Sequence, residues 1–115
     1  MDEGLRTEIN QLHAQICQAL ADSNRILILY TLADRPHPVS EICEAIDAPQ
    51  STVSRHLKVL RDRGLVSAER QGQSVVYAIQ DQRIIQALDI LRAVLGDHLA
   101  EHGNLGRRVA KELNR

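Results

Sequence analysis

Two pairs of side chains in this sequence have the chemistry and the spacing of metal ligands. His13 and Cys17 lie four residues apart, and so do His98 and His102. On a helix this spacing places both members of a pair on one face. Imidazole nitrogens and thiolates are ligands that zinc and similar metals prefer. The sequence therefore offers candidate metal ligands near both ends of the chain. The alternative is that these side chains only pack along the seams and rims of helices.

The two cysteines of the chain, Cys17 and Cys43, are a second candidate site. Two thiols can bind arsenite together, or they can form a disulfide that acts as a redox switch. Trivalent arsenic favours three thiols, however, and a free cysteine is often a small buried hydrophobic residue. Because Cys43 follows Ile42 on a helix expected to be largely buried, packing is the simpler interpretation of Cys43 taken alone.

The segment from Ser51 to Gln73 has the charge pattern of a DNA-binding surface. It is locally positive in a chain whose formal net charge is -1. Its charged residues are Arg55, Lys58, Arg61, Arg63 and Arg70, against Asp62 and Glu69. Clustered cations are what binding to DNA phosphates requires, so the distribution of charge favours a nucleic-acid partner although the total does not.

The polar side chains in and beside this segment suit contacts in a DNA groove. Short hydroxyl side chains allow a close approach to phosphates and base edges, whereas glutamine pairs with adenine and arginine with guanine. His56 is a further candidate contact, but it could equally be a half-buried residue bonded to a neighbour. The candidate DNA contacts are Gln50, Ser51, Thr52, Ser54, Arg55, His56, Lys58, Arg61, Arg70, Gln71 and Gln73. The alternative for each of them is a solvated polar face.

The elements that position these residues follow from the apolar pattern. Residues 39–63 contain two short amphipathic stretches joined by a turn at Pro49, which predicts a helix-turn-helix that Gly64 ends. Residues 65–79 contain two short strand-like runs around Gly72, which predicts a hairpin. A hairpin placed directly after a helix-turn-helix is a wing. Arg70, Gln71 and Gln73 would then contact the DNA backbone or the minor groove.

Longer amphipathic helices flank this motif, at about residues 5–21 and 81–102, and an apolar helix lies between residues 25 and 34. Each flanking helix carries an apolar stripe that is too long for one small core to cover. Pairing between two copies of the chain would bury both stripes. We therefore expect a homodimer formed through the first and last helices. The predicted fold is mainly α with a two-stranded β-wing, in the order α-α-α-α-β-β-α.

Length and composition set further limits. A chain of 115 residues fits a single domain, residues 1–115. Aromatic residues make up only 2% of the chain, which argues against a base-stacking platform for single-stranded nucleic acid. The acidic start and the lack of a long apolar run predict neither a signal peptide nor a membrane span, and two cysteines fit a reducing cytoplasm. No catalytic motif such as a phosphate-binding glycine loop or a nucleophile elbow is present, so we do not expect an enzyme.

Four segments of the chain form a further pattern: ALADSNRIL (residues 19–27), QSTVSRHLKVL (50–60), RGLV (63–66) and RQGQSVVY (70–77). Together they resemble the arsenic-repressor (ArsR/SmtB) family of transcription regulators. The resemblance covers roughly residues 16–95. It implies a homodimeric repressor that binds double-stranded operator DNA near its own promoter and releases it when an inducer binds. It also implies recognition-helix contacts from Gln50, Ser51, Ser54, Arg55 and His56.

The effector sites of that family match this sequence less well. The positions that bind zinc-group metals on the family's last helix are occupied here by Asp81, Arg83, Val94 and Asp97, and arginine and valine cannot ligate zinc. The Cys-x-Cys pair of other members is reduced to Cys43. A persulfide-sensing subgroup of the family uses one cysteine late in the second helix and another on the last helix. Here Tyr30 stands near the first of these positions, and the last helix contains no cysteine.

The resemblance also implies that the first helix packs against the last helix of the other chain, so that the two ligand pairs could meet across a dimer. The candidate effector residues are therefore His13, Cys17, Cys43, His98 and His102. A divalent metal, arsenite or a thiol oxidant are the candidate inducers. The alternative function is a winged-helix module that binds another protein and has no effector site.

Overall fold

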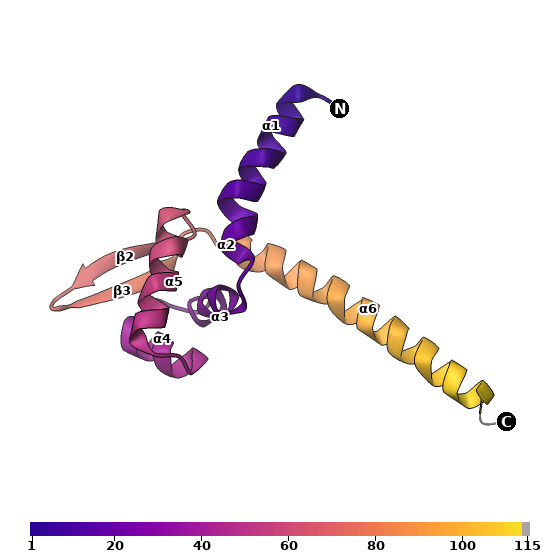
Figure 1. Cartoon of the computed structure of the whole chain (residues 1–115). Helices are drawn as coiled ribbons and strands as arrows, with labels where there is room; N and C mark the ends of the chain where they lie inside the picture. The colour runs from indigo at the N-terminus through magenta and orange to yellow at the C-terminus, as the bar shows by residue number, and fades with distance from the viewer. Residues whose placement is uncertain (114–115) are drawn as a thin grey trace. The chain divides into compact units, whose positions relative to one another are not determined.

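The computed structural model describes residues 1–113, with the side chains of residues 1–103 (Figure 1). Two units make up the chain, residues Met1–Gln82 and a second unit that begins at Arg83. The elements in chain order are α1 (Glu3–Leu12), η1 (His13–Cys17), α2 (Gln18–Leu20), α3 (Ser23–Thr31), β1 (His37–Pro38), α4 (Val39–Ile46), α5 (Gln50–Asp62), β2 (Val66–Gln71), β3 (Ser74–Ile79) and α6 (Arg83–Leu113).

The first helical segment begins with a side-chain cap, because the carboxylate of Asp2 accepts a hydrogen bond from the backbone N–H of Leu5 at 3.0 Å. The segment differs from the single helix expected for residues 5–21. A π-helical turn, η1, separates α1 from α2, and the N–H of Gln18 bonds to the carbonyl of His13. Apolar spacing does not distinguish a π-turn from an α-turn, so the sequence carried no signal for it. None of the residues of α1 is buried.

The hydrophobic core lies among α3, α4 and α5. Asp22 caps α3 by accepting hydrogen bonds from the N–H groups of Asn24 at 2.9 Å and Arg25 at 3.4 Å, as expected from its residue type. The core side chains of this unit are those of Ala19, Ile28, Leu29, Leu32, Ile42, Val53, Leu57, Leu60, Leu65 and Val66. Ile28 and Leu29 on α3 are fully buried, but Leu27 is 48% exposed, so the apolar helix is covered on one side and not all round.

Backbone conformation ends both helices of the helix-turn-helix. After α4, Asp47 adopts the left-handed conformation with a φ of 53°, and the N–H of Ala48 bonds to the carbonyl of Cys43 at 3.1 Å. After α5, Gly64 has a φ of 77°, and the N–H of Leu65 bonds to the carbonyl of Leu60 at 2.9 Å. The second arrangement is a glycine C-cap, in agreement with the sequence.

The wing is an antiparallel hairpin of β2 and β3, in which Gln71 pairs with Ser74 across a two-residue loop. Gly72 opens this loop with a φ of 64°, as glycine does at the first central position of a type II′ turn. The two-residue strand β1 also pairs with β3, with His37 opposite Tyr77. The sheet therefore has three strands in the order β1-β3-β2 rather than two. A run of two residues is too short to show alternation, so its sequence did not predict a strand.

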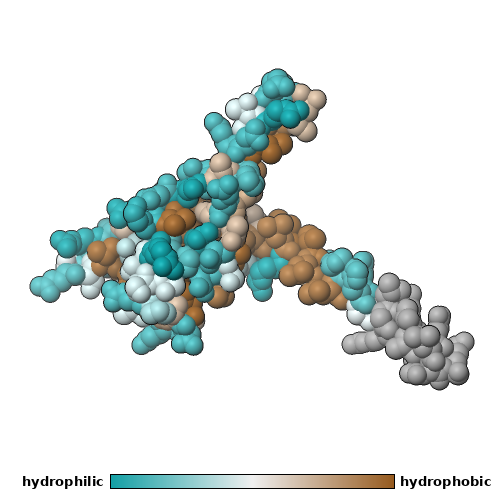
Figure 2. Space-filling view, in the orientation of Figure 1, coloured by the Kyte–Doolittle hydropathy of each residue, from teal (hydrophilic) through white to brown (hydrophobic). Residues whose placement is uncertain are grey.

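The second unit is the helix α6, which has 31 residues and continues beyond the predicted end at about residue 102. Apolar side chains along it, namely Ile90, Leu91, Val94, Leu95 and Leu99, are more than half exposed (Figure 2). Among the described residues, no helix combines the length and the apolar character needed to cross a bilayer.

Candidate nucleic-acid interface

One side of α5 is buried and the other is free for contacts. Val53, Leu57 and Leu60 are at most 1% exposed and fix the rotation of the helix against the core. The residues that this rotation leaves exposed are Gln50, Ser51, Ser54, Arg55, Lys58 and Arg61, whereas Thr52 is half-buried. The structure therefore brings most of the predicted recognition-helix residues together on one solvent-facing surface.

The wing presents the remaining candidates at its free end. Strand β2 runs from the buried Val66 to the exposed Arg70 and Gln71, and Gln73 lies in the exposed loop between the strands. Side chains at a hairpin tip can follow a DNA backbone or enter the minor groove beside the groove that holds the helix. The positive charge of Arg70 suits such a contact.

His56 departs from the expectation that it contacts DNA, because its side chain lies in the interior. The residue is 6% exposed, and its Nδ1 atom is 3.3 Å from the guanidinium of Arg25. Its Nε2 atom lies 3.8 Å from the carboxylate of Asp22. The same Arg25 side chain donates hydrogen bonds to the backbone oxygens of Ala19 at 2.6 Å and Gln18 at 3.2 Å. His56 is thus part of a brace that joins α5 to the N-terminal ends of α3 and α2.

The pKa of Asp22 reflects this brace. Partial burial raises the pKa of its carboxyl, but the N–H of Asn24 and the charge of His56 lower it by more. The net pKa lies below the ordinary aspartate value, with further lowering from Arg25. Asp22 is therefore a carboxylate that both caps α3 and faces the basic groups of the brace.

Arg63, which contributes to the positive charge of the segment in the sequence, is also engaged inside the protein. Its guanidinium donates a hydrogen bond to the backbone oxygen of Ala14, and the amide of Gln15 donates to the backbone oxygen of Arg63 at 3.3 Å. These two contacts attach η1 to the end of α5. Arg63 is half-buried and thus stands apart from the exposed arginines of the candidate interface.

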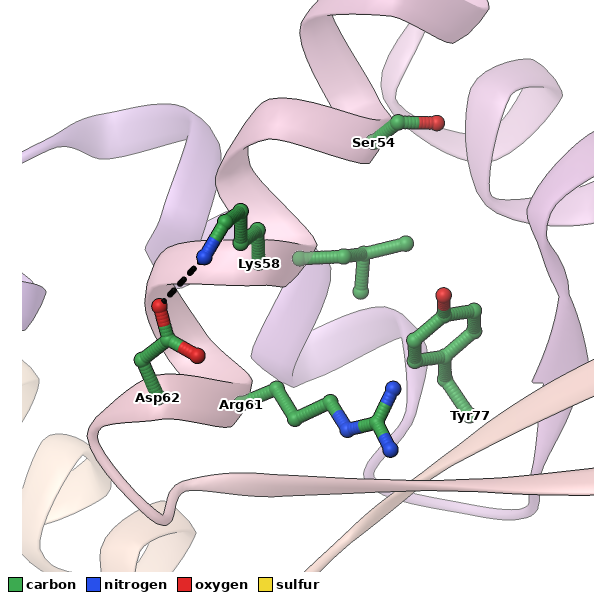
Figure 3. Close-up of a pocket in the computed structure, with 6 residues that line it drawn as sticks. Ser54, Lys58, Arg61, Asp62 and Tyr77 are labelled. Carbon is green, nitrogen blue, oxygen red and sulfur yellow. Dashed lines mark hydrogen bonds and ion pairs between the residues drawn. The ribbon is translucent and has the colours of Figure 1, made fainter.

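A pocket of about 320 Å³ opens between α5 and the wing (Figure 3). Its walls are formed by Ser54, Leu57, Lys58, Arg61 and Asp62 of α5 and by Tyr77 of β3. The ammonium of Lys58 lies 2.9 Å from the carboxylate of Asp62, whereas Arg61 extends toward Tyr77 (Figure 3). Tyr77 was not among the candidate residues expected from the sequence. The available signal was that, in a hairpin closed at Gly72, Tyr77 stands opposite the small Ala68.

A second buried histidine, His37, was also missed. Its Nδ1 atom is 3.1 Å from a carboxylate oxygen of Glu41, and its Nε2 atom is 3.4 Å from one of Asp34. Glu41 is also 3.5 Å from the guanidinium of Arg35. The hydrogen bond from His37 lowers the pKa of Asp34 below its usual value, although burial opposes the change. This cluster joins the loop after α3 to α4, so the contacts of His37 hold two segments of the fold together.

The candidate effector residues are accessible but lie in pairs or alone. His13 and Cys17 are exposed at the two ends of η1, and Cys43 is half-buried on α4. The rings of His98 and His102 on α6 have centroids 4.1 Å apart. Within the described part of the chain, no group of three or more histidine, cysteine, aspartate or glutamate side chains is arranged to hold a metal ion. A complete site would need ligands from elsewhere.

Comparison with known proteins gives consistent matches for this arrangement. A family model described as bacterial regulatory protein, arsR family, matches residues 22–68. The HTH-type transcriptional regulator NmtR of Mycobacterium tuberculosis is 46% identical over 76 residues, which are 66% of this chain and 63% of that protein. The arsenical resistance operon repressor of Bacillus subtilis is 34% identical over 85 residues, 73% of this chain and 80% of that protein. The chain thus spans less than two thirds of the length of NmtR.

A solved structure has the same fold. The homodimeric winged helix-turn-helix DNA-binding domain of a possible ArsR-family transcriptional regulator from Mycobacterium bovis superposes with a TM-score of 0.73 at 28% identity. The superposition covers 86% of this chain and 91% of that one. The winged helix-turn-helix inferred from the sequence is therefore confirmed.

Proposed function

The chain belongs to the ArsR family of bacterial regulatory proteins, and we propose that it is a transcriptional repressor that binds operator DNA as a homodimer and releases it in response to an inducer. The observation that carries this proposal is the exposed polar face of α5. That face presents Gln50, Ser51, Ser54, Arg55 and Arg61 beside a wing that carries Arg70. Each subunit places α5 in a major groove, and the two half-sites lie about 10 base pairs, or a multiple of this, apart.

Side chains on α5 divide into those that read bases and those that hold the backbone. Arg55 is long, exposed and one turn into the helix, so it reads a guanine, and Gln50 at the start of α5 reads an adenine. The hydroxyl groups of Ser51, Thr52 and Ser54 bond to phosphates or base edges. Arg70, Gln71 and Gln73 hold the backbone from the wing.

Dimerisation is supported by the apolar residues that the single chain leaves exposed. Leu5, Ile9 and Leu12 on α1 are each between 44% and 51% exposed, and the stripe of α6 is more exposed still. Such contiguous apolar surface is typical of protein–protein interfaces. The M. bovis structure with this fold is described as homodimeric.

For the inducer we propose a soft metal or metalloid ion bound by side chains of both subunits. His13 and Cys17 offer one pair of ligands, and His98 and His102 offer another, which together make the four ligands of a tetrahedral site. Cys17 and Cys43 are the alternative, as thiols for arsenite or an oxidant. The Bacillus relative is named for arsenical resistance, which supports a ligand of this chemical class.

The test is fluorescence anisotropy with labelled DNA from upstream of the protein's own gene, at fixed salt under reducing conditions, repeated with zinc, arsenite or a mild oxidant. We expect tight binding that one of these agents releases. Cys17→Ser should abolish the release in either version, whereas His98→Ala should abolish it only for a metal site and Cys43→Ser only for a thiol site. Binding that none of the agents changes would refute the effector sites but not the DNA function.

The DNA function itself fails if no duplex binds even at low salt. In that case the same exposed surface would have to meet a protein partner. Salt dependence separates the two cases, because DNA affinity falls steeply with salt as counterions are released, whereas protein association is less dependent on it.

A further inference from the structure

The pocket between α5 and the wing has an unpaired cation at one wall and hydroxyl groups at others. Among the described residues, the guanidinium of Arg61 has no hydrogen bond or ion pair, and it points toward the ring of Tyr77 (Figure 3). The hydroxyl groups of Tyr77 and Ser54 belong to the same pocket. An arginine with two hydroxyl donors around one space is the donor set that a phosphate oxygen requires.

The single acidic group of the pocket is neutralised from within. Asp62 lines the pocket and would repel a phosphate, but the ammonium of Lys58 is 2.9 Å from its carboxylate. Lys58 turns toward Asp62 and away from Arg61 (Figure 3). The pair cancels, so that the pocket keeps one net positive charge, which comes from Arg61. In this arrangement Lys58 screens an acid and leaves the phosphate contact to its neighbours.

The position of the pocket decides which phosphate it would hold. Its residues come from α5, which the proposed function places in the major groove, and from β3 of the wing, which would then border the same groove. A strand that runs along the edge of that groove passes between the two elements. Resting on the proposed DNA function, we propose that Arg61, Tyr77 and Ser54 bind one backbone phosphodiester of each operator half-site, and that the Lys58–Asp62 pair sets the strength of this contact.

Four variants of the Lys58–Asp62 pair test this arrangement against a direct contact from Lys58. The binding constant and its salt slope are measured on one duplex for the wild type, Lys58→Gln, Asp62→Asn and the double variant. If Lys58 only screens Asp62, Asp62→Asn binds more tightly, Lys58→Gln more weakly, and the double variant like the wild type. If Lys58 itself contacts the phosphate, the double variant stays as weak as Lys58→Gln, and our assignment is wrong.

The two donors leave different signatures in the same assay. Arg61→Gln should lower the salt slope by about one for each subunit, because each neutralised phosphate releases counterions. Tyr77→Phe should weaken binding about three- to tenfold and leave the slope unchanged, because a hydroxyl group releases no ion. Phenylalanine keeps the ring in the sheet, so folding is preserved. Arg6→Gln on α1 is the matched control, since it removes the same charge outside the pocket and should change neither quantity.

The phosphate can be located on the DNA by replacing single linkages with neutral methylphosphonates. At one position in each half-site the neutral linkage should weaken the wild type and no longer weaken Arg61→Gln, because both changes remove the same contact. If the wild type binds DNA but every neutral linkage weakens Arg61→Gln as much as it weakens the wild type, the pocket does not bind a phosphate. The DNA function would still stand. Wild-type protein that binds no duplex would instead refute the proposed function on which this inference rests.

Discussion

The central part of the molecule, from Ala19 to Ile79, buries its core within one chain, whereas α1 and the part of α6 from Ile90 to Leu99 leave large apolar side chains exposed. Ile85 and Leu88, near the start of α6, are buried. In the central part, Ile28, Leu29, Ile42 and Leu60 are fully buried. On α6 the apolar stripe includes Leu91, Leu95 and Leu99, which are 55% to 60% exposed. The two regions have similar amphipathic patterns, so a pattern alone does not say which partner covers a stripe.

The two regions therefore carry different candidate sites. The central part is rigidly specified by caps, buried side chains and a closed hairpin, and it carries the surface proposed to meet DNA. The flanking segments α1, η1 and α6 carry the exposed leucines together with four of the five candidate effector residues. An inducer that binds there would act on the contact between subunits and so on the spacing of two α5 helices.

The largest effect should separate the two regions directly. Leu29→Ala removes a fully buried side chain and should lower the free energy of unfolding by about 2–5 kcal/mol, because it leaves a cavity. Leu95→Ala, the matched change at a 55% exposed position, should weaken dimerisation instead. Sedimentation equilibrium gives the dimer constant, and chemical denaturation at several protein concentrations gives the stability. If Leu95→Ala left the dimer constant unchanged, α6 would not be part of the interface.

The second effect concerns the exposed face of the central part. Arg55→Ala should weaken operator binding by about 1–3 kcal/mol without changing the stability, because it removes a guanine contact but no internal one. Anisotropy titrations with the operator and with a duplex in which the contacted base pair is changed would measure it. The variant should bind the two duplexes alike. A preserved preference would show that another residue reads that base pair.

The third effect concerns the opposite face of the same helix. His56→Ala should lower the stability by about 1–3 kcal/mol, because it leaves the guanidinium of Arg25 without its partner on α5. The DNA affinity of the folded protein should stay close to that of the wild type, in contrast to Arg55→Ala. Thermal unfolding and anisotropy on the same preparation test both statements. A large loss of affinity with unchanged stability would restore His56 as a DNA contact.

The sequence predicted the fold wherever one residue type determines the local geometry. Gly64 and Gly72 each mark a helix end or a turn that the structure contains. The burial of His56 was also predictable, because it lies three residues after Val53 and four before Leu60, on the buried face of α5. The sequence analysis left a DNA contact and a half-buried position open for His56, and the structure supports the second.

Other features depend on contacts between distant segments, and no local pattern reveals them. The attachment of Arg63 to Ala14 joins residues that are 49 positions apart. The pocket at Tyr77 forms only when β3 lies beside α5. The π-turn at His13–Cys17 and the two-residue strand at His37–Pro38 are too short to show a period. The sequence therefore located the DNA-facing surface better than it located the contacts that support it.

The smallest effect concerns the turn between α4 and α5. Among the described residues, the one residue other than glycine with a positive φ lies in this turn. Asp47 has a φ of 53°, a conformation that costs a residue with a side chain more than it costs glycine. Asp47→Gly removes this cost but adds conformational freedom to the unfolded chain, so the gain in stability should be small, about 0.5 kcal/mol. Chemical denaturation measures it, with Asp47→Ala as the control that keeps the strain and should be less stable than the glycine variant.

Because this turn sets the angle between two helices that are both packed on α3, DNA affinity should stay unchanged in the glycine variant. A loss of affinity with a gain in stability would mean that the strained turn holds α5 in the orientation that the DNA groove requires.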